Sequence, residues 1–238
     1  MTNAEQRVHE HIVTRVCGGS FGGCGATREA RSVEQSGFLG DVYSQMHAGK
    51  DDEALLVYRN EKADWKSYEK VMIAPVTVWV GTKDSQLEYV SPLDRQRLAN
   101  DLWGKLHEAL QTDYEIVDEP GPGVLLIKAA ITEGEASWPV IDTVSTIVPQ
   151  MHVLSELKYL ATGTASFVGK ASGEIKVTDG QTGELLLAAA DRRAGGKRLE
   201  GVTHSWDDVE EVYRYWAEQS RWRLCKLRDA PDCVEPES

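Results

Sequence analysis

The sequence predicts an α+β domain in which a mostly antiparallel sheet carries two long amphipathic helices on one face. Two segments show helical periodicity, at residues 91–110 and 205–224, and the chain between them contains short β-branched and apolar runs. Two of these runs flank the glycine-containing loop Asp179–Gly183, which is typical of a hairpin. A helix with one apolar stripe buries that stripe against another element, so we expect both helices to pack on the sheet.

The first strands precede the first helix. Ala54–Tyr58 is a short apolar run that ends at the polar Arg59–Lys62. Val71–Val80 is β-branched and apolar at both alternating positions, which is typical of a strand covered on two sides. Pro75 lacks a backbone N–H donor, so we expect a bulge or a partly unpaired edge at that position.

The first helix has clear start signals. Ser91 can cap its amino end, Pro92 suits the first turn, and Asp94 places a negative charge near the positive end of the helix dipole. Apolar residues recur every four positions along one side, at Leu98, Leu102 and Leu106. His107 adjoins this stripe without a visible catalytic partner, which favours packing over a role as a general base.

The later elements are two strands joined by a turn, then a hairpin and the second helix. A central strand is expected over Val124–Thr132, and Glu133-Gly134-Glu135 should end it. The last hairpin strand is expected to end at Ala190, and Trp138–Pro149 should lack regular structure. Tyr114–Val117 is expected to be a short strand, followed by the turn Pro120–Gly123. Thr164–Thr178 should form a strand pair or one bent strand, with Glu184–Ala190 as its hairpin partner. Ser205 and Asp208 should cap the second helix.

Length and charge indicate one acidic domain with two tails. The chain has 238 residues and a formal charge of −12, of which the body from 36 to 227 carries −9. Residues 1–35 are expected to be a disordered or vestigial leader, and residues 228–238 an acidic disordered tail. An acidic surface opposes phosphate binding, which excludes a nucleic-acid partner. No apolar run approaches the roughly 20 residues that span a bilayer.

Four cysteines lie near the ends of the chain. In an oxidising compartment four cysteines allow three disulfide connectivities. For Cys225 and Cys233 we instead expect incidental thiols, that is, free cysteines without a structural role. Phe21–Gly25 has the small-small-Cys pattern of a lipoprotein cleavage site around Cys24, although the polar stretch before it is a poor export signal. A metal site is a weaker hypothesis for this segment, with four side chains as its possible ligands: His9, His11, Cys17 and Cys24. The ligands of tetrahedral zinc sites usually lie closer together in the sequence than these residues do.

The sequence contains no complete catalytic motif. Gly163–Lys170 has five residues between its glycines where a phosphate-binding loop has four, and no Gly-x-Ser-x-Gly elbow occurs. Arg192 and Arg193 follow the predicted last strand and could bind an anion together with His204. The favoured alternative is an internal ion-pair network between these arginines and acidic residues of the last helix, at Asp207, Asp208 or Glu211.

Short motifs are spread along the body of the chain. They are Ser36–Leu39, Leu56–Asn60 with Trp65 and Tyr68, Lys70–Val76, Pro120–Leu125, Thr132, Phe167–Gly169, Thr182–Leu185 and Asp191–Arg193. Their combination resembles the bacterial lipoprotein family known as domain of unknown function 3313. The similarity runs from about Ser36 to about Leu227, which is nearly the whole body.

The resemblance implies an exported, lipid-anchored protein on the periplasmic face of the outer membrane, with the lipid on Cys24. The family has no assigned activity, so none is carried over, and no cofactor is expected. We therefore expect a non-enzymatic module of the cell envelope that binds another envelope protein or a cell-wall component, with membrane contact only through the lipid. The alternative is a soluble, cytoplasmic small-anion binder or enzyme that uses Arg192, Arg193 and His204.

Overall fold

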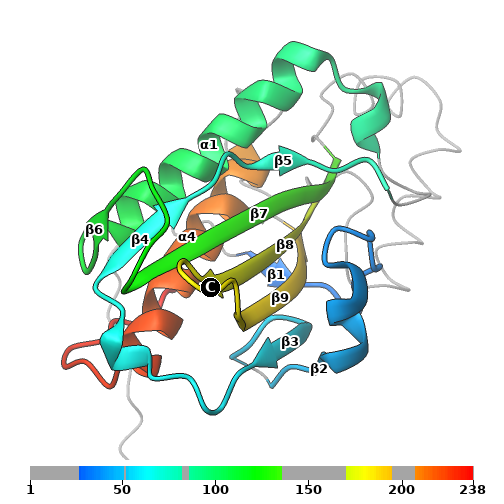
Figure 1. Ribbon diagram of the computed structural model, residues 1–238. Helices are drawn as coiled ribbons and strands as arrows, with labels where there is room; N and C mark the ends of the chain where they lie inside the picture. Colours follow the sequence, from blue (N-terminus) through cyan, green and yellow to red (C-terminus); the bar gives the residue numbers. More distant parts are fainter. Residues whose placement is uncertain (1–26, 51, 82–85, 136–169, 195–206, 238) are drawn as a thin grey trace, which may run out of the picture.

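Within the described residues, nine strands form one mixed sheet (Figure 1). The computed structural model describes residues 27–50, 52–81, 86–135, 170–194 and 207–237. The strands follow one another across the sheet in the order β2-β3-β9-β8-β7-β4-β6, with β1 beside β9 and β5 beside β7. Their bounds are Arg28–Glu29 (β1), His47–Ala48 (β2), Leu56–Arg59 (β3), Lys70–Ile73 (β4), Thr77–Val78 (β5), Glu115–Ile116 (β6), Val124–Glu135 (β7), Lys170–Asp179 (β8) and Leu185–Ala194 (β9).

Most neighbouring strands are antiparallel, as predicted. β7, β8, β9, β3 and β2 form a continuous antiparallel series, whereas β4 and β5 run parallel to β7, and β6 runs parallel to β4. Parallel strands need a crossover, and α1, Pro92–Leu110, lies in the chain between β4 and β7. The predicted α+β fold class is confirmed, with a parallel part on one side of the sheet.

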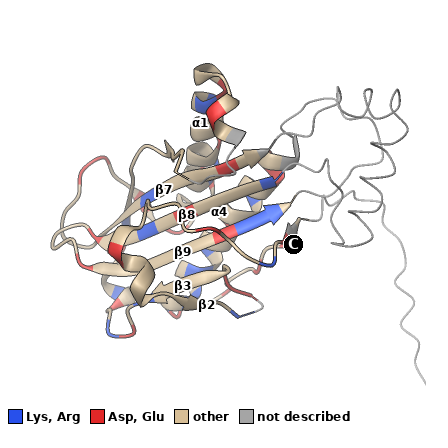
Figure 2. Cartoon of the chain, turned by 90° about the vertical axis from the view of Figure 1, so that its right-hand side faces the viewer, with Lys and Arg blue, Asp and Glu red and all other residues tan. Residues whose placement is uncertain are grey.

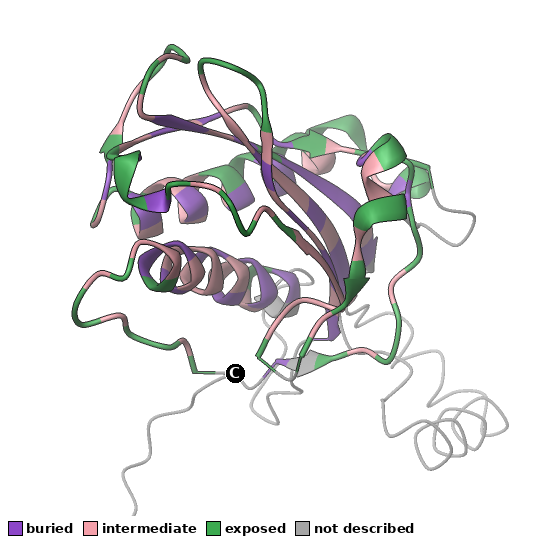
Figure 3. Cartoon of the chain, turned by 60° about the horizontal axis from the view of Figure 1, so that its bottom comes forward, coloured by how far each residue is buried: buried purple, intermediate pink, exposed green. Residues whose placement is uncertain are grey.

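Two long helices, α1 and α4 (Asp207–Leu227), pack side by side on one face of the sheet (Figure 1). Ser91 caps α1, since its Oγ accepts a hydrogen bond from the backbone N–H of Asp94 at 3.1 Å. The predicted stripe of leucines is buried, and Figure 3 shows that both helices turn buried residues toward the interior. Among the described helices, none combines the length and apolar character that a bilayer crossing requires. Short 3-10 helices occupy Gly40–Gln45, Trp65–Ser67 and Gln86–Tyr89.

The first long predicted strand is divided in two. Val71–Val80 contributes to β4 and β5, and the gap between these strands contains Pro75, which has no N–H to donate to the neighbouring strand. The backbone N–H groups of Ala74 and Trp79 still donate to carbonyls of β7, at 2.9 and 2.8 Å. Both halves therefore stay aligned with β7, and the disturbance predicted at the proline is confirmed.

Two later strands are longer than predicted. β7 continues through Glu135, and its register with β8 shifts between Ile131 and Glu133. β9 continues through Ala194 instead of ending at Ala190, because its backbone stays paired with β8 on one side and with β1 at its far end. Asp191–Arg193 therefore lies inside a strand, where successive side chains point to opposite faces. Other predicted features lie outside the described residues: the loop 138–149, residues 164–169 and the cap at Ser205.

The carboxyl-terminal end is linked back to the body. Cys225 on α4 and Cys233 form a disulfide, with their Cα atoms 5.7 Å apart, so the expectation of incidental thiols is wrong for this pair. Between them, Asp229 accepts a hydrogen bond from Lys66 Nζ at 3.0 Å. Residues 228–237 contain no helix or strand. The disulfide and the ion pair attach this coil to the domain.

The sheet face away from the helices is partly covered by the segment that follows Ser36 (Figure 1). Glu174 points from β8 toward this cover and is only 2% exposed. Its carboxylate accepts hydrogen bonds from the Ser36 backbone N–H at 3.1 Å and from the Tyr43 hydroxyl at 2.6 Å. Burial, and then the bond to Glu174, raise the pKa of Tyr43. These contacts fasten the amino-terminal part of the domain to the sheet.

Candidate functional site

A groove of ≈ 440 Å³ lies between α4 and the helix-covered face of the sheet, beside β3 and β9. Strand alternation explains its floor. Val57, Ala189 and Ile175 pair across β3, β9 and β8, so their side chains share the face toward α4. The opposite wall comes from one side of α4, where lining residues recur at helical spacing: Trp216, Ser220, Leu224 and Leu227.

Gly173 and Trp216 fix the wall at one end of the groove. A Cβ atom on Gly173 would lie 2.9 Å from a ring carbon of Trp216, so glycine is what lets the indole approach β8 this closely. The indole Nε1 donates a hydrogen bond to Asp191 Oδ2 at 2.8 Å. Trp216 is therefore held by packing on one side and by a carboxylate on the other.

A buried ion pair lies at the same end. Arg193 Nη1 is 3.9 Å from Asp191 Oδ2, and the two residues are 6% and 7% exposed. The Arg193 guanidinium carbon also lies 3.8 Å from the centre of the Tyr215 ring, and its Nε donates to Thr27 Oγ1 at 3.0 Å. Burial raises the pKa of Asp191, and the bond from Trp216 and the charge of Arg193 only partly offset it.

Charged side chains surround the mouth of the groove. Arg223 on α4 pairs with Asp52 at 3.0 Å and with Glu53 at 3.8 Å, and it also donates to the Asp52 carbonyl oxygen. Arg59 at the end of β3 pairs with Glu61 at 2.7 Å. The groove is therefore apolar in its middle and charged at its opening, which suits a ligand with an apolar body and a polar end.

Arg192 and Arg193, the blue end of β9 in Figure 2, point to opposite faces of the strand. Arg192 lies on the face away from the helices, where its Nε and Nη2 donate to the two carboxylate oxygens of Glu133, each at 2.7 Å. Ser172 Oγ donates to the same carboxylate at 2.6 Å. The two guanidinium groups therefore do not meet at one anion, and His204 lies outside the described residues. Anion binding by these three residues stays a prediction.

Both arginines form internal ion pairs within the described part of the chain. Their described carboxylate partners are Glu133 and Asp191. Glu211, one of the three expected partners, pairs with Arg214 on its own helix at 2.9 Å, and the side chains of Asp207 and Asp208 lie outside the described part of the structure. Because β9 extends through Ala194, both arginines lie in the sheet, where strands β7 and β9 supply these two carboxylates.

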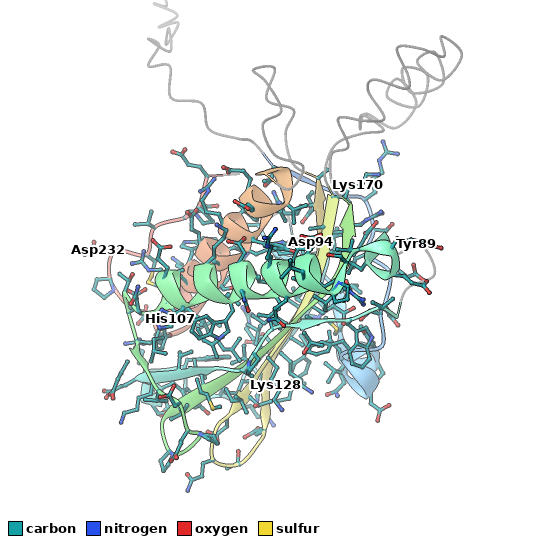
Figure 4. The ribbon with its side chains drawn as sticks, turned by 90° about the horizontal axis from the view of Figure 1, so that it is seen from above. Tyr89, Asp94, His107, Lys128, Lys170 and Asp232 are labelled. Atoms are coloured by element: carbon teal, nitrogen blue, oxygen red, sulfur yellow. A yellow bond between two sulfur atoms is a disulfide. The ribbon has the colours of Figure 1, made fainter. Side chains whose placement is uncertain are left out.

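Other candidate residues from the sequence are placed as follows. His107, which Figure 4 labels, lies on α1. Its ring packs against that of Trp103, with ring centres 5.1 Å apart, which agrees with the packing role expected for it. Cys24, the predicted lipid attachment site, lies outside the described residues, as do His9, His11 and Cys17. Among the residues that the structure describes, no group of three His, Cys, Asp or Glu side chains could hold a metal ion.

Sequence reasoning did not identify the groove. The nearest signal is Ala189 on β9, whose small side chain leaves space in front of the face toward α4. Small residues in a strand are compatible with close packing by a helix as well as with a cavity. The distance between α4 and β9 decides between these outcomes, and it depends on the whole domain.

Comparison with known proteins identifies the family. The profile described as "Protein of unknown function (DUF3313)" matches residues 34–220, and the chain belongs to this family, as the motifs predicted. Among curated proteins, none matches the chain significantly. Solved structures also resemble the chain, among them the following two, each at 10% sequence identity. A PelC dodecamer from Paraburkholderia phytofirmans matches with a TM-score of 0.39 over 74% of this chain and 98% of that chain. A neuraminyllactose-binding hemagglutinin homolog from Helicobacter pylori matches with a TM-score of 0.30 over 79% and 92%.

Proposed function

We propose that this member of the DUF3313 family is a non-enzymatic binding module of the cell envelope, and that the groove beside α4 is its ligand site. The groove carries the proposal. Protein ligand sites are concave, mostly apolar and roughly 300–1,000 Å³ in volume, and the groove, at ≈ 440 Å³, lies in that range. A few charged groups at its mouth supply the orientation that an apolar floor alone does not.

The polar groups of the groove favour binding over catalysis. Asp191 is engaged by Trp216 and Arg193, and Arg223 is engaged by carboxylates at the mouth. The described lining of the groove contains one serine, Ser220. Its hydroxyl donates a hydrogen bond to the Trp216 carbonyl at 2.8 Å rather than to a base. Nucleophilic catalysis needs a nucleophile beside a base, and these groups do not supply that pair.

Replacing Ala189 by Trp should abolish binding of an uncharged apolar dye such as N-phenylnaphthylamine. Ala189 lines the groove and is only partly buried, so the larger side chain would fill the cavity instead of displacing the core. We expect the wild-type chain to bind the dye saturably at one site per molecule. The variant should bind at least about tenfold more weakly in a fluorescence titration.

Thr178→Trp is the matched control for this experiment. It adds the same side chain to β8 on the face away from the helices, outside the groove lining, and should leave dye binding unchanged. Wild-type protein that shows no saturable binding contradicts the proposed site. Equal affinity for the wild type and Ala189→Trp contradicts it as well.

An envelope location is supported by the disulfide between Cys225 and Cys233. Disulfides persist in oxidising compartments such as the periplasm and are rare in a reducing cytosol. The resemblance of the motifs to a lipoprotein family points the same way, with Cys24 as the anchor. In this proposal the partners are another envelope protein or a cell-wall component, and the protein contacts the membrane only through its lipid.

Labelling with a clickable fatty acid in the native host tests this location. We expect the protein to incorporate the label and Cys24→Ala to lose it. Alkylation of unreduced protein from the same cells should leave Cys225 and Cys233 unmodified, because both sulfurs are in the disulfide. Unlabelled wild-type protein would refute the anchor. Both carboxyl-terminal cysteines reacting before reduction would argue for a reducing compartment.

A further inference from the structure

The middle of the groove is aliphatic. Its lining there consists of hydrocarbon side chains from the sheet and the two helices: Val57, Leu106, Ile127, Ile175, Leu187 and Leu224. A sugar would bring hydroxyl groups onto this surface, and each costs free energy when it is left without a hydrogen-bond partner in apolar surroundings. A hydrocarbon chain has no such groups, so its burial is favourable along its whole length.

A peptide strand does not suit the floor either. Peptides that dock on sheets add to an exposed strand edge and bond with its backbone. Here the backbone of β9 is paired with β8 on one side and with β3 on the other. The floor therefore offers side chains only, and the amide groups of a peptide lying on it would lack partners.

The charged residues at the mouth include more cations than carboxylates. Asp191 and Arg193 pair with each other in the interior, and Glu174 is bonded to Ser36 and Tyr43 on the face away from the helices. The charged lining residues that remain are the cations Lys50, Arg59, Arg223 and Lys226 and the carboxylates Asp52, Glu53 and Glu61. Both arginines pair with these carboxylates, whereas neither lysine forms an ion pair within the described part of the chain. The chain as a whole has a formal charge of −12, so this local excess of positive charge runs against its composition. Charge complementarity thus favours an anionic group at the mouth.

We infer that the ligand of the groove is a fatty-acid anion. Its alkyl chain lies along the aliphatic floor, and its carboxylate lies at the mouth near Lys50 and Lys226. This ligand class rests on the proposed function of the groove as a binding site. It goes beyond that proposal because it assigns a chemistry to each end of the ligand.

Three amphiphiles with the same alkyl chain test the assignment. The full-length chain is titrated with laurate, dodecyltrimethylammonium and dodecyl maltoside below their micelle concentrations, and displacement of N-phenylnaphthylamine is followed. Laurate should bind about tenfold more tightly than the ammonium compound, because one head group is attracted by the mouth and the other repelled. Added salt should weaken laurate binding and leave the maltoside unaffected.

Charge reversal at the mouth should remove the preference. The double variant Lys50→Glu/Lys226→Glu should bind laurate about tenfold more weakly and dodecyltrimethylammonium more tightly than the wild type does. The matched control is Lys128→Glu/Lys176→Glu, which makes the same change of charge on the opposite face of the sheet. These two lysines are paired across β7 and β8, and Figure 4 labels Lys128. The control should leave the binding of both amphiphiles unchanged. The control also corrects for the effect of net charge on anion binding.

The outcomes separate this inference from the proposed function. Equal affinity for all three amphiphiles, with Ala189→Trp still blocking them, overturns the fatty-acid assignment and leaves the groove as a binding site. A preference for the ammonium head group, or the same loss of laurate binding in both double variants, also overturns the assignment. Absence of binding by every amphiphile and by the dye overturns both.

Discussion

Glu174→Ala should lower the free energy of unfolding by about 3–6 kcal/mol, because two hydrogen bonds to a carboxylate are lost and each contributes about 1.5–3 kcal/mol. The carboxylate is buried, and it accepts bonds of 3.1 Å from the Ser36 N–H and 2.6 Å from the Tyr43 hydroxyl. Its removal leaves both donors without this acceptor beneath the amino-terminal segment. Urea unfolding followed by tryptophan fluorescence measures the change.

Two further variants separate the hydrogen bonds from the loss of volume. Glu174→Gln keeps the size of the side chain and one acceptor oxygen, so its loss of stability should be intermediate. Tyr43→Phe removes one donor, and a double-mutant cycle with Glu174→Ala should give a coupling energy of about 1.5 kcal/mol. A Glu174→Ala protein that unfolds at the wild-type urea concentration would show that this carboxylate does not anchor the segment. The anchor matters for function because the segment leads back toward Cys24, the proposed lipid site.

Asp191→Ala should lower the free energy of unfolding by about 3–5 kcal/mol, the usual cost of removing one partner from a buried ion pair. The Arg193 guanidinium would lose the carboxylate 3.9 Å from it, and Trp216 Nε1 would lose its acceptor. The same unfolding experiment measures the effect. Because Asp191 and Trp216 also line the groove, the variant should bind the apolar dye more weakly.

A second substitution tests whether the buried charge is the cause. Asp191→Ala/Arg193→Met removes both charges, so the double variant should be clearly more stable than Asp191→Ala alone. Methionine keeps an apolar, flexible side chain beside Tyr215, where the arginine now packs. If the double variant is as unstable as the sum of the single variants, the ion pair does not explain the loss.

The raised pKa of Asp191 gives this site a pH dependence. Burial raises the pKa in the folded chain, so the unfolded chain releases this proton first as the pH rises above about 4. The stability that Asp191 contributes is therefore fully present below about pH 4 and is lost as the pH rises through the folded-state pKa. Asp191→Asn removes the titration. The stability of the wild type relative to Asp191→Asn should therefore be highest in acid and fall toward neutral pH, and a difference that grows with pH would contradict the shift.

Signals between near neighbours in the chain predicted most of the fold. Ser91 caps α1, and the leucine stripe that follows it is buried, because both depend on residues within a few helical turns. The hairpin loop was predicted for the same reason. Asp179 Oδ1 accepts hydrogen bonds from the backbone N–H groups of Gln181 and Thr182, at 2.9 and 2.6 Å, two and three residues away.

The site depends on contacts between residues far apart in the chain. Arg192 was identified from the sequence, but its partner Glu133 lies 59 residues away and meets it only because β7, β8 and β9 align in one register. The groove likewise requires α4 to stand away from β9, and no local pattern encodes that distance.

By itself, the sequence determined the α+β class, the family, the start of the first long helix and the acidic charge of the body. Each of these follows from composition, from motifs or from periodicity over a few residues. The tertiary structure alone decided that Arg192 and Arg193 serve opposite faces, that Cys225 bonds to Cys233, and that a charged mouth opens onto an aliphatic floor. Register and helix position set these features, and both are properties of the packed chain rather than of any segment.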